Sequence, residues 1–371
     1  MRIGLFLPNW LGDLVMATPA IRALRRHFGR DTEVSGILRP HLRPVLDGSE
    51  WLDAIWDFHP GGTRGQGRVR LIRHMRAVRF DLVVLMTNSL HTALLAWAGG
   101  ARERVGYIRD CRGLLLTRGI RPPRQGRRIA PMPVVDYYLK LAGELGCGPE
   151  SPRLELPFTE EDARAGDCLW NQLGLRNDDR VVVVNSSGAF GAAKIWPTEH
   201  AAVLAWRIAE ELDHDVIILC GPREREAARK TAELAGHPRV FAIPPELIGI
   251  PTSKACIRRC RVMVSTDSGP RHIAAAFGKP VVTLFGPTDP VWVENPTVRG
   301  VDLRLELDCI GCRRRVCPLG HHRCMKDLLP GMVFSAVERS LTQVSSRRPR
   351  PECRGPQEPC VLHGRAPSRL K

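Results

Sequence analysis

The sequence predicts an α/β protein built from two doubly wound domains that face a central cleft. In the second half of the chain, short β-branched runs alternate with helix patterns, which is typical of a parallel sheet covered by helices on both faces. The first half shows a looser version of the same alternation. The length of 371 residues allows each of two domains to bury its own core.

The first half opens on a strand pattern, and a polar turn and an apolar-periodic helix follow it. Strands are expected at residues 3–7, 33–38 and 81–86. The helix runs through Ile21, Leu24 and Phe28, and Pro19 either kinks it or marks its start. Two stretches are expected to be surface loops: 60–70 is rich in Gly and Arg, and 118–133 is rich in Arg and Pro.

The second half has the clearer pattern. Strands are expected at 181–184, 216–220, 240–243, 262–265 and 281–285, and helices at 198–212, 222–235, 253–259 and 269–277. These elements predict an N-terminal domain at 1–158, a linking helix at 159–175 and a second domain at 176–344. The tail, 345–371, is rich in Pro and Arg, and we expect it to be disordered.

Composition limits the class of protein and the kind of partner. The hydrophobic share of 43% and the charged share of 25% are those of a soluble globular chain. No apolar run is long enough to span a bilayer, and the start lacks the features of a signal peptide, so a cytoplasmic protein is expected. The net charge of +16 favours a phosphate-bearing partner, which is a nucleic acid, an anionic membrane surface or a phosphorylated substrate.

Four segments follow predicted strands, and ligands of open α/β sheets bind at that edge. The first is Asn-Trp-Leu-Gly-Asp at 9–13. Gly12 allows close backbone approach, and Asp13 is placed to accept a proton from an incoming hydroxyl. The alternative is that Asp13 only caps a helix.

The second segment joins Asn-Ser-Ser-Gly at 185–188 to Lys-Ile-Trp-Pro at 194–197. Ser186 and Ser187 suit contacts to phosphate or ribose, and Lys194 suits neutralisation of a diphosphate. A solvated loop lysine is the alternative for Lys194.

The third segment runs from Ser265 to His272 and gives the most specific local pattern. A strand ends in a Ser/Asp/Gly turn where a helix begins, and free N–H groups at a helix start bind anions. Asp267 suits sugar hydroxyls, and His272 lies within reach of a phosphate or a sugar. Capping by Asp267 or Ser268 is the alternative. The fourth segment, 285–290, holds two prolines and favours a fixed turn.

Two further patterns suggest metal sites. Asp213 and Asp215 resemble the carboxylate pair of metal-dependent glycosyltransferases, but they lie at the amino end of the predicted sheet, away from the cleft. Twelve cysteines in a cytosolic chain indicate free thiols or a metal. The close spacing of Cys309, Cys312, Cys317 and Cys324 places four thiols within reach of one soft ion such as zinc, and reduced thiols in a late loop are the alternative.

The four strand-end segments, in this order, resemble the ADP-heptose:lipopolysaccharide heptosyltransferases of glycosyltransferase family 9. The similarity rests on 8–13, 188–197, 266–276 and 285–288, and the run 317–324 is similar to the heptosyltransferase II branch. It covers roughly residues 1–340. Pro270 and Arg271 stand where the family more often has two apolar residues.

The resemblance implies a GT-B fold and an inverting transfer that uses no metal or cofactor. It implies that Asp13 is the general base, and that Lys194 and the amides of Ser268 and Gly269 hold the leaving diphosphate. It further implies donor contacts from Ser186, Ser187, Glu224, Asp267 and His272. The substrates it implies are ADP-heptose and a phosphorylated lipid A–core acceptor at an anionic membrane surface.

Three alternatives remain at this point. The same fold can use another nucleotide-sugar donor, or it can hydrolyse or epimerise a nucleotide sugar. A nucleic-acid-binding protein is the alternative of another class, suggested by the net charge. It predicts aromatic side chains among the positive charges, but aromatics are only 6% of the chain and are not interleaved with the arginines.

Overall fold

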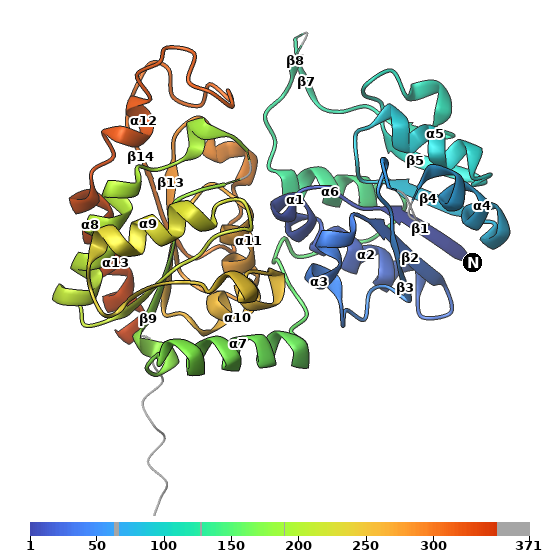
Figure 1. Cartoon of the computed structure of the whole chain (residues 1–371). Coiled ribbons are helices and arrows are strands. Elements are labelled where there is room, and N and C mark those ends of the chain that lie inside the picture. Colours follow the sequence, from blue (N-terminus) through green and yellow to red (C-terminus); the bar gives the residue numbers. More distant parts are fainter. Residues whose placement is uncertain (63–66, 127, 189, 347–371) are drawn as a thin grey trace, which may run out of the picture.

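The computed structural model describes residues 1–62, 67–126, 128–188 and 190–346. Two six-stranded sheets, each flanked by helices, stand beside one another (Figure 1). Residues 347–371 of the predicted tail and residues 63–66 of the predicted loop lie outside the described residues. The first two residues of the predicted tail, 345 and 346, end helix α13 (Pro330–Ser346). Among the described residues, every helix is too short or too polar to cross a lipid bilayer.

The first sheet is entirely parallel and has the strand order β3-β2-β1-β4-β5-β6. Its strands are β1 (Arg2–Phe6), β2 (Glu33–Leu38), β3 (Ala54–Asp57), β4 (Leu82–Leu85), β5 (Glu103–Tyr107) and β6 (Arg118–Ile120). Its helices are α1 (Leu11–Met16), α2 (Thr18–Phe28), α3 (Arg43–Leu46), α4 (Arg68–Val78), α5 (Leu90–Ala98) and α6 (Val134–Gly143). The strand order reverses between β1 and β4, where doubly wound sheets bind ligands.

The second sheet repeats this topology with the order β11-β10-β9-β12-β13-β14. Its strands are β9 (Val181–Asn185), β10 (Asp215–Ile218), β11 (Val240–Ala242), β12 (Val262–Thr266), β13 (Val281–Phe285) and β14 (Gly300–Arg304). Its helices are α8 (Thr198–Glu211), α9 (Arg225–Ala235), α10 (Ile250–Arg259), α11 (Gly269–Ala276), α12 (Arg323–Lys326) and α13 (Pro330–Ser346). The long helix α7 (Glu160–Leu173) connects the two halves.

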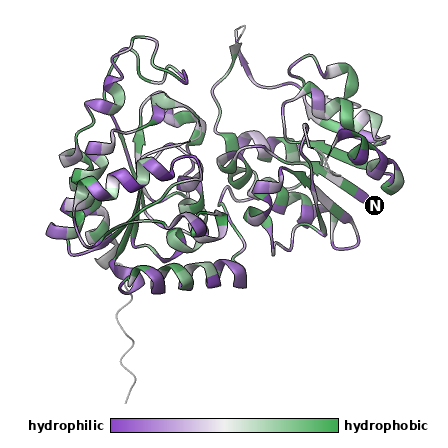
Figure 2. Cartoon of the chain, viewed as in Figure 1, coloured by the Kyte–Doolittle hydropathy of each residue, from purple (hydrophilic) through white to green (hydrophobic). Residues whose placement is uncertain are grey.

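Burial explains why these sequences form central strands. All five residues of β9, β12 and β13 are buried, as expected of parallel strands covered on both faces. Figure 2 shows apolar colour along the strands and polar colour on the outer sides of the helices. The apolar faces of α8 and α13 close one side of the second sheet, with Trp196 fully buried there.

The predicted fold class and every strand proposed from the sequence are confirmed, with ends that shift by up to two residues. Pro19 marks the start of α2 rather than a kink. Two loop predictions were wrong in part, because α4 begins at Arg68 inside the first one. The second contains β6 and an antiparallel hairpin of β7 (Arg124–Gln125) and β8 (Arg128–Ile129). The predicted domain boundaries remain predictions.

A buried ion pair joins three helices at the connection between the halves. Lys254 on α10 donates to Asp162 Oδ2 on α7 at 2.5 Å and to the carbonyl oxygen of Pro44 on α3 at 3.1 Å. Both charged side chains are almost completely buried. Asp162 also accepts from the backbone N–H of Thr159 in a capping box that starts α7. The connection therefore contacts both halves through one charge cluster.

Candidate active site

Helices α1 and α11 pack against each other where the carboxyl edges of the two sheets meet. Glycines on both helices permit this approach. A Cβ built on Gly12 would lie 2.9 Å from Cδ2 of His272, and a Cβ on Gly269 would lie 2.8 Å from Cδ2 of Leu11. Because such distances are too short for real side chains, the contact requires small residues there. It brings Asp13 of α1 to the predicted donor-binding segment.

Asp13 occupies the first turn of α1 and does not cap that helix; the N-cap residue is Trp10. The carboxyl is partly buried between the halves. Burial raises the pKa of Asp13 to about 6; Lys194 opposes the rise and Asp267 adds to it. Lys194 and Asp267 therefore lie close enough to Asp13 to change the pKa of its carboxyl. A carboxylate with this pKa is ionised at neutral pH and is well suited to accept a proton.

Lys194 and Asp267 form a buried ion pair from different loops of the second half. Lys194 Nζ donates to Asp267 Oδ2 at 2.9 Å and to the Asp267 carbonyl oxygen at 2.5 Å. The two residues are 8% and 7% exposed, so the solvated-lysine alternative is wrong. Both residues influence the pKa of Asp13, so the three predicted residues form one charged cluster.

Arg271 is a member of this cluster that the sequence did not single out as a site residue. Its guanidinium lies 3.3 Å from Asp267 Oδ1 across one helical turn, and Arg271 is 4% exposed. Burial opposes ionisation of Asp267, but Lys194 and Arg271 outweigh it and hold the pKa of Asp267 at about 2. The available signal was the four-residue spacing between Asp267, just before the start of α11, and Arg271 in the first turn of that helix.

The start of α11 is oriented by Asn185 and lacks a side-chain cap. Ser268 is the N-cap residue, but no side chain caps the helix. Instead, the amide of Asn185 donates to Ser268 Oγ at 2.8 Å and to Ser265 Oγ at 3.1 Å. Neither Asp267 nor Ser268 therefore acts as the predicted cap, and the amide of Gly269 remains available at the positive end of the helix dipole. Asn185, which sequence reasoning did not propose, fixes this geometry.

The remaining predicted residues lie around the same edge. The backbone oxygen of Ser187 accepts from Thr266 Oγ1 at 2.7 Å, and that of Ser186 accepts from the N–H of Trp196 at 2.9 Å. Glu224 lies just beyond β10 and accepts from the N–H of Gly221 at 2.7 Å. This bond positions the Glu224 carboxylate at the carboxyl edge of the sheet.

His272 is buried against α1 one turn inside α11. Burial lowers the pKa of His272 to about 3, and Arg271 contributes to the decrease. The imidazole is therefore neutral at physiological pH. It can offer one hydrogen-bond donor or acceptor to a ligand, but no positive charge.

The cysteine-rich segment packs on the loop that carries Lys194. The N–H of Ala193 donates to the Arg315 carbonyl at 3.0 Å, and His322 Nε2 lies 2.7 Å from the Ala193 carbonyl. All ten cysteines in the described part of the chain are free. No three potential ligands in that part are placed to hold a metal ion. The four thiols nevertheless lie near one another, because burial raises the pKa of Cys324 and Cys309, Cys312 and Cys317 all add to the rise. Cys324 is buried near Gly286, whereas Cys312 lies exposed in the loop.

Asp213 and Asp215 lie at the opposite edge of the sheet, where arginines form ion pairs with both carboxylates. Arg176 contacts both carboxylates at 3.0 Å, and Arg180 lies 3.3 Å from Asp213. Arg239 also pairs with Asp213. These ion pairs give the two carboxylates a structural role away from the candidate site.

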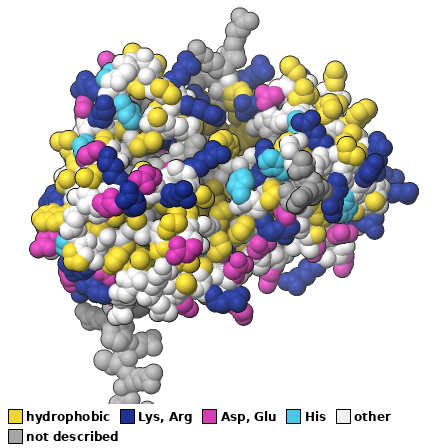
Figure 3. All heavy atoms as spheres, in the orientation of Figure 1, with side chains coloured by type: hydrophobic (Ala, Val, Ile, Leu, Met, Phe, Trp, Pro, Cys, Tyr) yellow, Lys and Arg dark blue, Asp and Glu magenta, His cyan; other side chains and the backbone are white. Residues whose placement is uncertain are grey.

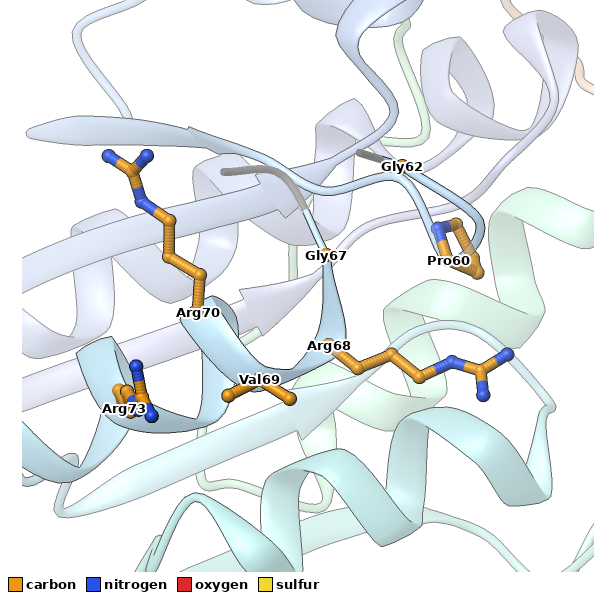
Figure 4. Close-up of a pocket in the computed structure, with 7 residues that line it drawn as sticks. All are labelled: Pro60, Gly62, Gly67, Arg68, Val69, Arg70 and Arg73. Atoms are coloured by element: carbon orange, nitrogen blue, oxygen red, sulfur yellow. The ribbon is translucent and has the colours of Figure 1, made fainter. Parts of the chain in front are cut away.

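Two cavities lie in the first half. The smaller, about 70 Å³, is at the carboxyl edge of the first sheet and is lined by Asn9, Arg39, Thr87, Ser89 and His91, among others. The larger, about 630 Å³, is lined by Pro60, Gly62 and the first turns of α4. Figure 4 shows Arg68 and Arg70 extending from α4 in different directions, with Arg73 one turn further along. Pro60 lines both cavities, so the first half offers a basic surface next to the smaller cavity.

Comparisons with known proteins agree with this architecture. A model of glycosyltransferase family 9 (heptosyltransferase) matches residues 68–323. Lipooligosaccharide heptosyltransferase 2 of Campylobacter jejuni is 26% identical, with 92% of this chain and 98% of that protein covered. Lipopolysaccharide heptosyltransferase 2 of Escherichia coli is 25% identical, with 92% and 99% covered.

Solved structures share the fold. The structure of E. coli ADP-heptose lipopolysaccharide heptosyltransferase II has a TM-score of 0.75 at 23% identity, with 93% of this chain and 100% of that chain covered. A family 9 glycosyltransferase from Veillonella parvula has a TM-score of 0.76 at 21% identity, with 92% and 97% covered. These matches confirm the predicted GT-B arrangement of two Rossmann-like domains. Together with the family match, which spans most of the chain, they show that the protein belongs to glycosyltransferase family 9, the heptosyltransferases.

Proposed function

We propose that this enzyme transfers heptose from ADP-heptose to the inner core of lipopolysaccharide with inversion at the sugar carbon. The observation that carries the proposal is the meeting of Asp13 with the Lys194–Asp267 pair across the contact of α1 and α11. Asp13 lies on one side of this contact as the single base. Lys194 and the uncapped start of α11 lie on the other side. An in-line displacement requires these two elements and no protein nucleophile.

In the proposed step, Asp13 removes the proton from the acceptor hydroxyl. The acceptor oxygen then bonds to the anomeric carbon of heptose while the bond from that carbon to the diphosphate oxygen breaks. Negative charge grows on the departing ADP, where Lys194 and the amides at Ser268 and Gly269 stabilise it. Because the pKa of Asp13 is raised to about 6, the base is both ionised and sufficiently basic near neutral pH.

The other residues of the edge are proposed to hold the donor. Asp267 and neutral His272 suit the hydroxyls of the sugar, and Ser186 and Ser187 suit phosphate oxygens. Glu224 suits the ribose hydroxyls, since its carboxylate is held at the end of β10. None of these contacts requires a metal ion, because Lys194 and the helix dipole provide the positive charge.

Arginines of the first half are proposed to capture the phosphorylated lipid A–core acceptor at the cytoplasmic face of an anionic membrane. The candidates are Arg64, Arg68, Arg70 and Arg73, followed by Arg118, Arg121, Arg124, Arg127 and Arg128. Arg64 and Arg127 lie outside the described residues. Arg68, Arg70 and Arg73 line the larger cavity. Each Lys or Arg near such a surface contributes about 1 kcal/mol of attraction, which salt screens.

A different nucleotide-sugar donor is the second candidate, and Arg271 is the observation that favours it. A buried guanidinium beside Asp267 adds a charge where the family more often has an apolar residue. This charge lies next to the residue proposed to bind the donor sugar.

A transfer assay tests the proposal. Purified protein is mixed with ADP-heptose or with a panel of other nucleotide sugars, each with a heptose-deficient core acceptor, in the presence and absence of EDTA. We expect transfer only from ADP-heptose, undiminished by EDTA. Transfer from another donor would support the second candidate. Loss of transfer in EDTA that Mg²⁺ restores would overturn the metal-independent mechanism, and stabilisation by oligonucleotides rather than ADP-heptose would overturn the enzyme proposal.

A further inference from the structure

Helix α5 presents an uncharged apolar face to solvent. Leu90, Leu94 and Trp97 are 43%, 48% and 57% exposed. Their spacing of four and three residues places them on one side of the helix. The opposite side packs into the protein through Thr92, Ala93, Leu95 and Ala96. Residues 82–101 contain no Lys, Arg, Asp or Glu, whereas the solvent face of a helix normally carries charge.

Neighbouring segments extend this surface. The 3-10 turn Gly113–Leu115 packs against α5, and its Leu114 is fully exposed. Ile108, which precedes this turn, is 39% exposed. We call Leu90, Leu94, Trp97, Ile108 and Leu114 the α5 face. Figure 3 shows apolar side chains gathered at the upper right, where Figure 1 places α5.

Positive charge surrounds the α5 face. Residues 59–128 contain fifteen arginines but only three acidic residues, Asp81, Glu103 and Asp110. Helix α4 packs beside α5 and exposes Arg68, Arg70 and Arg73. Arg118, Arg121 and Arg124 follow the turn on the other side and are also exposed. Within the described residues, none of these six arginines forms an ion pair.

We propose that the α5 face is a membrane-docking surface whose apolar side chains enter an anionic lipid leaflet while the flanking arginines contact the headgroups. An apolar strip bordered by arginines is the pattern of an interfacial helix. The charge pattern also separates this partner from a second copy of the chain. Two copies that met through this face would bring two arginine-rich borders together with too few carboxylates to neutralise them, since 59–128 holds fifteen arginines and three acidic residues.

The position of α5 connects docking to the candidate site. Helix α5 starts at the carboxyl edge of the first sheet, directly after Thr87 and Ser89, which line the smaller cavity. Asn9, four residues before the proposed base Asp13, lines the same cavity. A lipid-anchored acceptor held at this face would therefore present its sugar to the edge that carries Asp13. This docking role rests on the proposed function, because it assumes an acceptor in the bilayer.

Vesicle binding tests the proposal. The full chain, the double variant L94S/W97S and the matched control V203S/W206S are sedimented with phosphatidylcholine vesicles that contain or lack phosphatidylglycerol. The control removes a Val and a Trp that are 49% and 43% exposed on α8 of the other half. We expect the wild type and the control to bind the anionic vesicles. L94S/W97S should bind them about tenfold more weakly or worse, because two apolar side chains no longer leave water.

Transfer kinetics and sedimentation velocity complete the test. L94S/W97S should raise the KM for acceptor embedded in vesicles, and should leave kcat and KM unchanged for a water-soluble acceptor without acyl chains. Equal vesicle binding by all three proteins, or a dimer that L94S/W97S converts to monomers, would overturn the docking role. If the wild type bound anionic vesicles but transferred no heptose to the soluble acceptor, the proposed function would be wrong, whereas the docking role would still be supported.

Discussion

Gly12 faces His272 across the contact of the two halves so closely that a Cβ on Gly12 would lie 2.9 Å from Cδ2 of the imidazole. The absence of a side chain at position 12 lets α1 approach α11, and this approach carries Asp13 toward Lys194. The glycine after the first strand therefore sets the distance between the proposed base and the donor side.

We expect Gly12→Ala to destabilise the fold by about 1 to 3 kcal/mol, since the added methyl group overpacks this contact. Thermal unfolding measures the loss. The clash disappears when the imidazole is removed, so Gly12→Ala should cost much less stability in a His272→Ala background. Additive losses in this double-mutant cycle would show that the two residues do not interact.

Asp13→Asn should reduce kcat about 10²- to 10⁴-fold, because the amide cannot take the acceptor proton. The Kd for ADP should stay nearly unchanged, since the proposed base acts on the acceptor. Calorimetry with ADP and steady-state transfer rates separate the two effects. Asp136, an acidic residue in the first turn of α6, provides a control whose change to Asn should affect neither quantity. A variant at position 13 that kept half of the wild-type kcat would exclude Asp13 as the base.

The pH dependence follows from the same carboxyl. Burial raises the pKa of Asp13 to about 6, and a base works only when it is unprotonated. The value of kcat/KM should therefore be level above about pH 7 and fall about tenfold per unit well below pH 6. His272 is neutral throughout, because its pKa is lowered to about 3, so His272→Gln should leave the position of this acid limb unchanged. A limb that moved with that substitution would contradict the assignment to Asp13.

The central strands, and the residues that meet at the candidate site, could be predicted because both depend on local sequence. Buried parallel strands are continuous β-branched runs, and polar residues that follow them must meet at one edge of the sheet. Asp13, Lys194 and Asp267 were found by that rule. Strands β3, β5, β6 and β14 were missed, since β3 and β14 are at most partly buried and β5 and β6 start with charged residues.

What the sequence could not give depends on packing between distant segments. The role of Asn185 in orienting Ser268 requires the register of β9 against β12. The path of the cysteine-rich loop is tethered by the bond from Gly311 N–H to the Gly286 carbonyl, and residue spacing does not encode such a contact. Pairing of Asp213 with Arg239 also joins segments far apart in the chain.

Lys194→Met should weaken ADP binding, because the diphosphate loses a buried charged donor worth about 1.5 to 3 kcal/mol. It should also lower kcat, since charge on the diphosphate grows as the bond breaks. Asp267 keeps one cation, Arg271, at 3.3 Å, so the variant should still fold. Circular dichroism checks folding, while calorimetry with ADP and transfer rates report function. If both the affinity for ADP and kcat were unchanged, Lys194 would have no role in donor binding or catalysis.

The buried pair of Lys254 and Asp162 leads to a prediction about how the halves are joined. Lys254→Met removes the donor to Asp162 and to the Pro44 carbonyl, and leaves a carboxylate that is 2% exposed in its side chain. Removal of one partner of a buried pair costs about 3 to 5 kcal/mol. We expect a loss of this size in urea unfolding.

The double variant K254M/D162N separates the cost of the unpaired charge from the cost of lost packing around Lys254. Asparagine can still accept from the N–H of Thr159, so the start of α7 keeps its cap. The uncompensated charge is gone, and the double variant should therefore be more stable than K254M alone, although both lack the bond to Pro44. If the double variant were the less stable of the two, the destabilisation would come from lost packing around Lys254, and the ion pair would have no special role in joining α7 to α10.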